Sequence, residues 1–250
     1  KQAAIQKKIG PSSAYSELKP TERLFDKDQP LSQFSAKVIL CEPVRDQADS
    51  SEPTWSVILD RTGFYPESGG QLCDQGNLED AHVLHVGINE GVIIHTVDRP
   101  LAHGPITGKI DQFRRDQISQ HHTSVHIVGG SAREILGSHI WQAGSYKSEQ
   151  LARLDITHFN RLTRDQLDEI EDHANAIVAE NRRVLTTVLD RADADKEHGF
   201  SIYQGGPPKH DRIRVVEVEG HDIQACGGTH VSNTLEIGEI KIVRSSHCLL

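Results

Sequence analysis

Four side chains suited to binding a transition metal fall into two short motifs. His122 and His126 are spaced H-x-x-x-H, and residues four apart on a helix share one face, so both imidazoles can reach one ion. Cys226 and His230 form C-G-G-T-H, in which two glycines let the backbone fold so that the thiolate and the imidazole converge. Nitrogen and sulfur ligands suit zinc better than magnesium or calcium. The two motifs together predict one metal site that holds Zn²⁺.

The motifs leave the role of this metal open. Each has a plain structural explanation when taken alone, because two of 15 histidines can fall four apart by chance and a buried cysteine can precede a glycine turn. Four protein ligands in a closed tetrahedron would make the metal structural. Three ligands and a water would make it catalytic, with the pKa of the water lowered to about 7. In that case Cys226 or His230 could handle protons instead of binding the ion.

Other polar residues could line a pocket. The sequence F-Y-P-E-S-G-G-Q ends at Gln71 and is either a hairpin turn or a loop whose bare backbone at Gly69 and Gly70 approaches a substrate. Gln142 and Ser145 lie in a polar stretch with the same potential. Asp155 could orient a metal-bound histidine, although we favour a satisfied carboxylate at a strand end. The remaining histidines are interpreted as exposed or packing residues.

The first half of the chain has the pattern of short strands. Brief β-branched runs at 34–40, 54–60, 82–87 and 91–97 are separated by Gly, Pro, Asp and Asn. Such spacing predicts a small barrel or sandwich, and we expect a glycine-rich β-barrel subdomain at residues 31–105. Residues 1–30 are polar, contain Pro, Ser and Lys, and are interpreted as a linker from a preceding region.

From Asp111 the pattern becomes a mixture of helix and strand. Residues 117–136 have helical apolar spacing. Gly129 and Gly130 weaken that helix by up to about 1 kcal/mol each, unless they allow close packing against a sheet. A helix over 163–181 is the clearest one, with Thr163 as N-cap and Gln166 as its capping-box partner. Further strands are expected at 152–159, 184–190, 212–220, 221–228 and 237–247.

This order of elements predicts the α+β class, with the zinc-binding core at residues 106–250 and no strict βαβ repeat. The content of 36% hydrophobic residues suits a soluble globular protein. No run approaches the roughly 18 apolar residues of a membrane span, so we expect no membrane partner. The net charge of −9 argues against a protein that binds nucleic acid over its whole surface. Four cysteines without paired spacing favour a reduced, cytoplasmic setting.

The motifs taken together resemble the editing domain of archaeal-type alanyl-tRNA synthetases, a domain that also occurs in free-standing AlaX deacylases. The likeness rests on H-x-x-x-H, on C-G-G-T-H and on F-Y-P-E-x-G-G-Q. It extends to W-Q-A-G-S-Y-K-S-E-Q-L-A-R-L-D-I-T-H-F and A-D-K-E-H-G-F-S-I-Y-Q-G-G, and covers roughly residues 20–245. The core should then be similar to the threonyl/alanyl-tRNA synthetase second additional domain.

The resemblance implies zinc-dependent hydrolysis of the aminoacyl ester of Ser-tRNA(Ala) and Gly-tRNA(Ala), the implied partners. An alanine pocket cannot strongly exclude glycine or an analogue that adds one hydroxyl, so a second, hydrolytic site is needed. The residues that match the zinc motif, and that would carry the catalysis, are His122, His126, Cys226 and His230. The residues that match positions around the substrate are Gly69, Gly70, Gln71, Thr123, Gln142 and Ser145.

One position departs from the family pattern. The family often has Thr directly before the second motif histidine, as H-T-A-T-H, whereas this chain has H-T-S-V-H with Val125. A hydroxyl that would recognise the substrate serine is missing there. Either Thr123 or Ser124 compensates, or the selection of serine depends on other residues.

We expect a fragment of a full synthetase, because the first twenty residues are polar and the sequence contains no Met. An aminoacylation domain would precede it and an oligomerisation region would follow, and these other domains would supply much of the tRNA affinity. No ATP-binding motif is found in the 250 residues. Three alternatives stay open: a free-standing trans-editing deacylase of the AlaX type, a non-catalytic tRNA-binding module with structural zinc, and a zinc hydrolase for another ester or amide.

Overall fold

The computed structural model describes residues 15, 18–26, 31–44, 53–204 and 211–247. The chain forms two compact units, of which the first comprises residues 1–68 and 72–115 and the second residues 69–71 and 116–250. The described elements of the first unit are mainly strands, and those of the second are helices and strands, so the predicted α+β class with a barrel is confirmed. Most of the predicted linker lies outside the described residues. In the described part of the chain, no helix combines the length and the apolar character that crossing a membrane requires.

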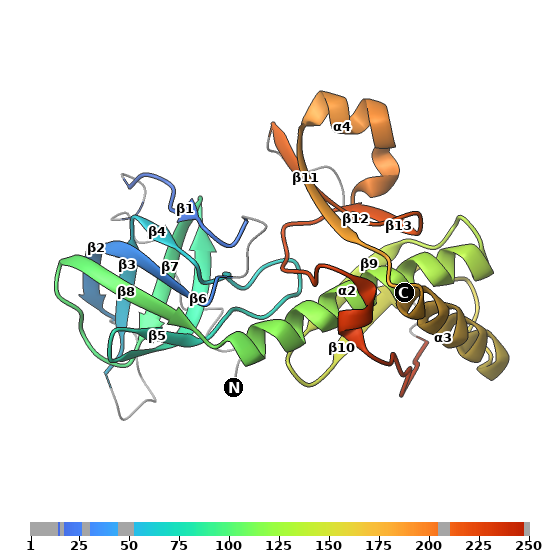
Figure 1. Cartoon of the computed structure of the whole chain (residues 1–250), viewed down its shortest axis with the longest axis horizontal. Helices are drawn as coiled ribbons and strands as arrows, with labels where there is room; N and C mark the ends of the chain where they lie inside the picture. The colour runs from blue at the N-terminus through green and yellow to red at the C-terminus, as the bar shows by residue number, and fades with distance from the viewer. Residues whose placement is uncertain (1–14, 16–17, 27–30, 45–52, 205–210, 248–250) are drawn as a thin grey trace. The chain divides into compact units, whose positions relative to one another are not determined.

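Six antiparallel strands close the barrel of the first unit (Figure 1). In barrel order they are β2 (Gln33–Pro43), β3 (Trp55–Leu59), β7 (Val92–Val97), β6 (Ala81–Asn89), β5 (Gly76–Leu78) and β8 (Gly104–Ile110). A short parallel pair is made by β1 (Glu22–Arg23) and β4 (Arg61–Thr62). The four predicted runs coincide with β2, β3, β6 and β7. We did not predict β5, which has only three residues, or β8, which contains two glycines and a proline.

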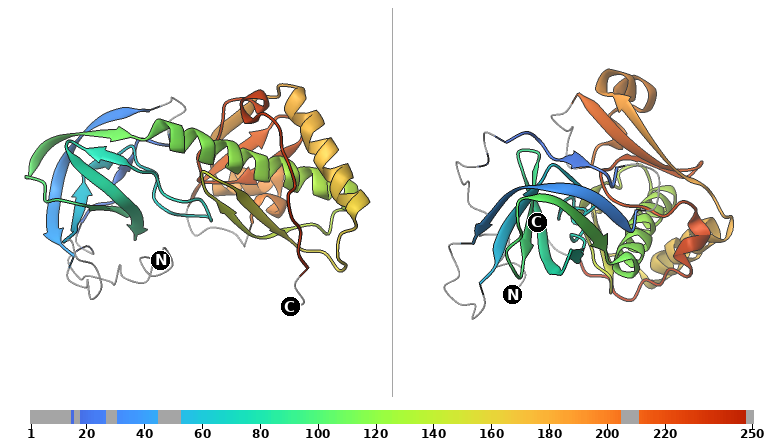
Figure 2. Two further views of the ribbon diagram at one scale, coloured as in Figure 1. Left: turned by 90° about the horizontal axis from the view of Figure 1, so that it is seen from below. Right: turned by 60° about the vertical axis from the view of Figure 1, so that its left-hand side comes forward.

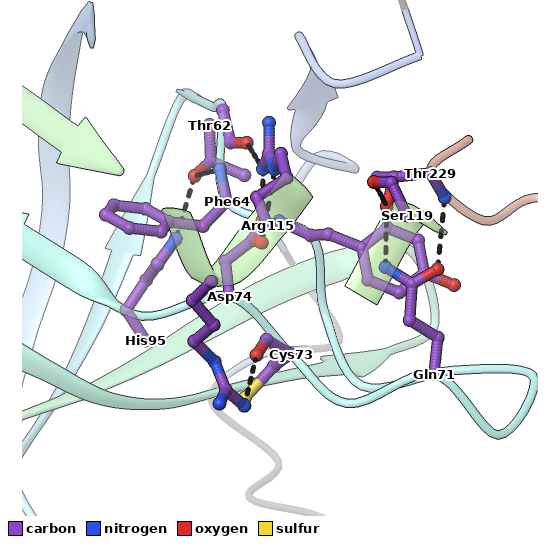
Figure 3. A network of polar contacts seen from close by, with 12 residues as sticks. Thr62, Phe64, Gln71, Cys73, Asp74, His95, Arg115, Ser119 and Thr229 are labelled. Atoms are coloured by element: carbon purple, nitrogen blue, oxygen red, sulfur yellow. Dashed lines mark hydrogen bonds and ion pairs between the residues drawn. The ribbon is translucent and has the colours of Figure 1, made fainter. Parts of the chain in front are cut away.

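Two polar groups are held inside the barrel unit. His95 is fully buried, with Nε2 2.9 Å from Thr62 Oγ1 and Nδ1 3.1 Å from Val57 O. Burial lowers the pKa of His95 to about 4, so the imidazole is neutral at pH 7. Arg115 forms an ion pair with Asp74, and its guanidinium also donates to a backbone carbonyl of the loop after β4 (Figure 3). These contacts fix the loop that joins β4 to β5.

Two helices form one layer of the second unit: α2 (Gln112–Leu136) and α3 (Arg164–Ala179). The two helices lie side by side (Figure 2). They pack together through buried apolar side chains such as Ile127, Ala132 and Ile177. The predicted capping box of α3 is confirmed, because the side chains of Thr163 and Gln166 each accept from the other residue's backbone N–H. The helix α2 continues through both of its internal glycines.

Gly130 is the glycine of α2 whose small size is required. A Cβ atom at this position would lie 2.6 Å from His221 Nε2, which itself lies 2.9 Å from the carbonyl oxygen of Ile127. The turn at His221, which leads into the strand Asp222–Ala225, can therefore lie directly on α2. This close packing compensates for the low helix propensity of glycine.

Two small sheets complete the second unit. The strands β11 (Val184–Asp190), β12 (Arg212–Val218) and β13 (Asp222–Ala225) form an antiparallel sheet, and β9 (Gln142–Lys147) pairs with β10 (Ala152–Ile156). The short helices are α4 (Arg191–His198), η1 (Phe200–Ile202) and η2 (Thr234–Ile237). The strands of the three-stranded sheet were predicted, whereas β9 and α4 were not. The strand predicted at 152–159 ends at Ile156.

The prediction of a final strand at 237–247 is wrong. After η2 the backbone runs along α3 instead of joining a sheet. Asn175 of α3 accepts from the N–H of Ile240 at 2.8 Å and donates to its carbonyl at 2.9 Å, and Glu171 accepts from the N–H of Ile242. Both isoleucines pack against the helix layer. Side chains of a helix thus supply the backbone hydrogen bonds that a sheet would have provided.

Candidate metal centre

The four predicted ligands converge in the second unit. His122 and His126 lie one turn apart on α2, Cys226 follows β13, and His230 lies in the loop before η2. One donor atom from each lies within 4.8 Å of the others, and Cys226 Sγ is 3.4 Å from Nε2 of both His122 and His230. In tetrahedral zinc sites, bonds of about 2.0–2.3 Å place neighbouring donors about 3.5 Å apart. The donor set and its spacing therefore fit zinc.

The imidazole of His122 is oriented by the side chain of Gln71. Its Nδ1 lies 2.7 Å from Gln71 Oε1, which leaves Nε2 directed at the donor cluster. Gln71 is fixed in turn, because its Nε2 donates to Thr229 Oγ1 at 2.9 Å and its Oε1 accepts from the Thr229 N–H at 3.0 Å (Figure 3). Ser119 donates to the same hydroxyl at 2.7 Å. An acceptor that holds the outer nitrogen of a histidine is the usual support of a metal ligand.

His230 is oriented by Thr123. Its Nδ1 lies 3.1 Å from Thr123 Oγ1, and that hydroxyl donates to the Ser119 carbonyl at 2.9 Å and accepts from the N–H of Val231 at 3.3 Å. Because Thr123 gives its proton to a carbonyl, it acts as an acceptor toward His230. Nδ1 of His230 therefore carries its hydrogen, and Nε2 presents its lone pair to the cluster.

His126 is oriented by Asp222, a residue that sequence reasoning did not single out. The distance from His126 Nδ1 to Asp222 Oδ2 is 3.3 Å, and both side chains are buried. Asp222 also meets Arg133 at 3.2 Å and accepts from Gln224 at 2.7 Å. Burial alone would raise the pKa of the Asp222 carboxyl, but His126 and Arg133 outweigh it and the pKa falls below its usual value.

The protonation states favour metal ligands. Burial opposes ionisation of the Cys226 thiol, but the neighbouring imidazoles of His122 and His230 lower its pKa well below the usual range. Burial lowers the pKa of His122 to about 4, and burial also lowers the pKa of His230 well below its usual value. Burial also opposes protonation of His126, yet its interactions with the Asp222 carboxylate and with Cys226 raise its pKa to about 9. A thiolate and neutral imidazoles are the forms that bind a metal, and only His126 among these groups would release a proton to do so.

The glycine loop and β9 form a polar edge beside this cluster. Gly70 has φ +76° and carries no Cβ, which would lie 2.0 Å from the Ser145 carbonyl oxygen. Gly69 and Gly70 are exposed, while Gln142 and Ser145 are half-buried and joined by a hydrogen bond of 3.3 Å from Gln142 Nε2 to Ser145 Oγ. The loop therefore needs glycine to lie against β9, and both β9 side chains remain reachable from solvent.

Three other candidates are accounted for by their contacts. Thr123 is fully buried and its hydroxyl is engaged, so we assign it to holding His230. Val125 is buried in the second unit and carries no polar atom. Asp155 pairs with Arg153 at 3.0 Å, which agrees with a satisfied carboxylate. Sequence reasoning also missed Lys147, which lies in a polar stretch where no motif marks it as buried.

A second group of donor atoms lies in the first unit. Glu67, Cys73 and His85 bring one atom each within 4.8 Å of one another, and His85 Nε2 lies 3.2 Å from Glu67 Oε2. Burial raises the pKa of the Cys73 thiol to about 11, so it is protonated at pH 7. A thiol is a poor ligand, and we assign no metal to this group.

Comparisons with known proteins agree with the motifs. Residues 213–247, which include Cys226 and His230, match the model of the threonyl and alanyl tRNA synthetase second additional domain, and residues 2–112 match that of the class II (A) tRNA synthetases. Over 236 residues, 92% of this chain, the sequence is 42% identical to the alanine–tRNA ligase of Halorubrum lacusprofundi. The chain belongs to the alanine–tRNA ligase family.

Two further relatives show the same extent of similarity. The alanine–tRNA ligase of Pyrococcus furiosus is 43% identical over 92% of this chain, and that of Ignicoccus hospitalis is 42% identical over 90%. The chain spans about a quarter of the length of these relatives, 25% and 24% respectively. The predicted resemblance to the archaeal-type synthetases is thereby confirmed.

Proposed function

We propose that this chain is the editing part of an alanine–tRNA ligase and hydrolyses the aminoacyl ester of Ser-tRNA(Ala) and Gly-tRNA(Ala). The observation that carries the proposal is the convergence of His122, His126, Cys226 and His230 in a chain of this family. We further propose that other domains of the same synthetase, which could also oligomerise, contribute to binding the tRNA.

The four side chains would hold Zn²⁺, and the other residues of the site hold the four in place. When bound, the ion would supply a concentrated positive charge that can polarise an ester carbonyl. The acceptors at the outer nitrogens keep each imidazole directed at the cluster. Cys226 and His230 are half-buried, so the cluster is reached from solvent on their side.

The selection of serine is assigned to β9. Val125 offers no hydroxyl, and the hydroxyl of Thr123 is already engaged with His230. Gln142 and Ser145 remain half-buried beside the glycine loop, and their amide and hydroxyl can bond to the substrate. A polar site matters here because an apolar pocket discriminates poorly against an added hydroxyl.

The test is deacylation of Ser-tRNA(Ala) and Gly-tRNA(Ala) by the purified chain, with zinc content measured on the same sample. We expect hydrolysis with one zinc per chain, and loss of both in Cys226→Ala. The matched control is Cys41→Ala, in a half-buried cysteine of the barrel. A zinc-loaded chain that hydrolyses neither ester at high protein concentration would contradict the proposal.

A second candidate is a non-catalytic tRNA-binding module with structural zinc. It is favoured by one observation: all four donors converge, as in a closed tetrahedral site. It predicts tRNA binding without ester hydrolysis by the zinc-loaded chain. The same measurement therefore separates the two functions.

A further inference from the structure

Lys147 is a buried cation at the polar edge of the site. It is 1% exposed, and its Nζ donates to the carbonyl of Gly69 at 2.9 Å and to Ser145 Oγ at 2.7 Å. Its backbone N–H donates to the carbonyl of Gly70 at 2.7 Å. One residue of β9 thus binds both glycines of the loop and one of the two pocket side chains.

The contacts of Lys147 are unusual for a residue that only stabilises a fold. Burying an ammonium group is costly unless a counter-charge pairs with it. Within the described residues, no carboxylate forms an ion pair with Lys147; its Nζ is hydrogen-bonded to a carbonyl and a hydroxyl, and the Cys226 thiolate attracts it without a hydrogen bond. An apolar side chain of similar length would avoid this cost. We therefore attribute the presence of an ammonium group at this buried position to the Gly69 carbonyl and the Ser145 hydroxyl that it binds.

We propose that Lys147 is a positioning residue of the editing site, which locks the loop Gly69–Gln71 onto β9 and sets the hydroxyl of Ser145. The first effect follows along the chain, because Gln71 follows both glycines and its Oε1 orients His122. The second follows from proton counting. Ser145 Oγ accepts from Lys147 and from Gln142, so its own hydrogen is available to a substrate oxygen.

The inference rests on the proposed function for its kinetic test, but one readout does not need activity. Lys147→Met keeps the length of the side chain and removes both hydrogen bonds from Nζ, while the backbone bond to Gly70 can remain. Lys196→Met is the matched control, because Lys196 is exposed on α4. We expect faster hydrogen exchange at the amides of residues 69–71 in Lys147→Met only. Unchanged exchange there would overturn the proposal whether or not the chain is a deacylase.

Kinetics separate positioning from stability. In zinc-loaded, folded Lys147→Met we expect kcat for Ser-tRNA(Ala) to fall about 10–100-fold, because misplacement by about 1 Å can cost that much. The fall should be smaller for Gly-tRNA(Ala), which has no side-chain hydroxyl for Ser145 to meet, and Lys147→Arg should restore part of the rate. A kcat within about twofold of the unchanged chain at full zinc content would overturn the proposal. Lys147→Gln, which keeps a shorter donor, replaces the Met variant if that does not fold.

Discussion

The second unit and the barrel unit each bring a cysteine and at least one histidine together, yet their chemistry differs. In the second unit, the pKa of Cys226 is lowered by the imidazoles beside it. In the barrel, the pKa of Cys73 is raised to about 11 by burial, and nearby Glu67 opposes ionisation further. The same residue type is thus a thiolate at one site and a thiol at the other.

The orientation of the imidazoles differs in the same way. Nδ1 of His122 lies 2.7 Å from an amide oxygen that is itself held by two hydrogen bonds. At His85, the hydrogen-bond partner of Nε2 is Glu67 at 3.2 Å, which is itself a member of the candidate group, so no residue from outside the group holds this ring among the hydrogen bonds of the described residues. Donor proximity alone therefore does not make a metal site. A metal site also requires ligands in the right protonation state and a partner that fixes each imidazole ring.

The largest expected effect is the loss of zinc in Cys226→Ala. Removing the thiolate deletes a ligand and the charge that the imidazoles surround. We expect zinc affinity to fall by more than about a hundredfold, since changes to supporting residues alone cost about 10–100-fold. Equilibrium dialysis against a zinc buffer, followed by metal analysis, measures it.

Cys73→Ala is the matched change in the barrel and should keep the zinc content of the unaltered chain. If both variants lost zinc equally, or if the unaltered chain bound two zinc ions and Cys73→Ala bound one, the contrast between the two groups would be wrong.

The next effect concerns the support of a ligand. Thr123→Val keeps the shape of the side chain and removes the acceptor at Nδ1 of His230. We expect zinc affinity to fall about 10–100-fold, as is typical for supporting residues. Ser124→Ala is the control on the same helix, because that hydroxyl donates to the carbonyl of Gln120 within α2 and contacts no metal ligand among the described residues. Equal affinities for both variants would show that His230 needs no such support.

The metal ligands could be predicted from the sequence, but the roles of the residues that orient them could not. The pair His122 and His126 follows from helix geometry alone, and C-G-G-T-H is a local motif. Asp222 is separated from His126 by 96 positions in the chain, and only the folded sheet places its carboxylate at that ring. Lys147 can be buried on β9 because its ammonium donates to the Gly69 carbonyl and to the Ser145 hydroxyl, and no local sequence pattern encodes the contact with Gly69.

The fold shows the same division. The strand β2 alternates between exposed and buried residues over its first seven positions, and this period of two identifies it as a strand. The segment 237–247 carries the same alternation at Ile240 and Ile242 but packs on α3, where Asn175 completes its hydrogen bonds. An alternation with a period of two indicates that one face of a segment is buried, but it does not indicate whether a sheet or a helix covers that face.

A smaller effect should appear in the pH dependence of the barrel. The folded pKa of Cys73 is raised from 9.0 to about 11, so its contribution to stability is complete below about pH 9 and is lost as the pH rises through about 11. At about 1.4 kcal/mol per pKa unit, the loss is about 1.4 kcal/mol at pH 10. The free energy of unfolding, measured with urea from pH 7 to 11, should therefore fall less steeply in Cys73→Ala than in the unaltered chain. Parallel curves above pH 9 would contradict the buried thiol.

The smallest effect is expected for Glu67→Gln. His85 Nε2 and Glu67 Oε2 are 3.2 Å apart, but both side chains are partly exposed, and such pairs contribute about 0–1 kcal/mol. We expect urea unfolding to change by less than about 1 kcal/mol, as for the exposed control Glu239→Gln, and zinc content to stay unchanged. If Glu67→Gln instead lowered the number of zinc ions bound per chain, the barrel group would be a second metal site. The inference that a protonated Cys73 thiol excludes a metal from this group would then be wrong, because a bound ion can itself drive the deprotonation of a coordinating cysteine.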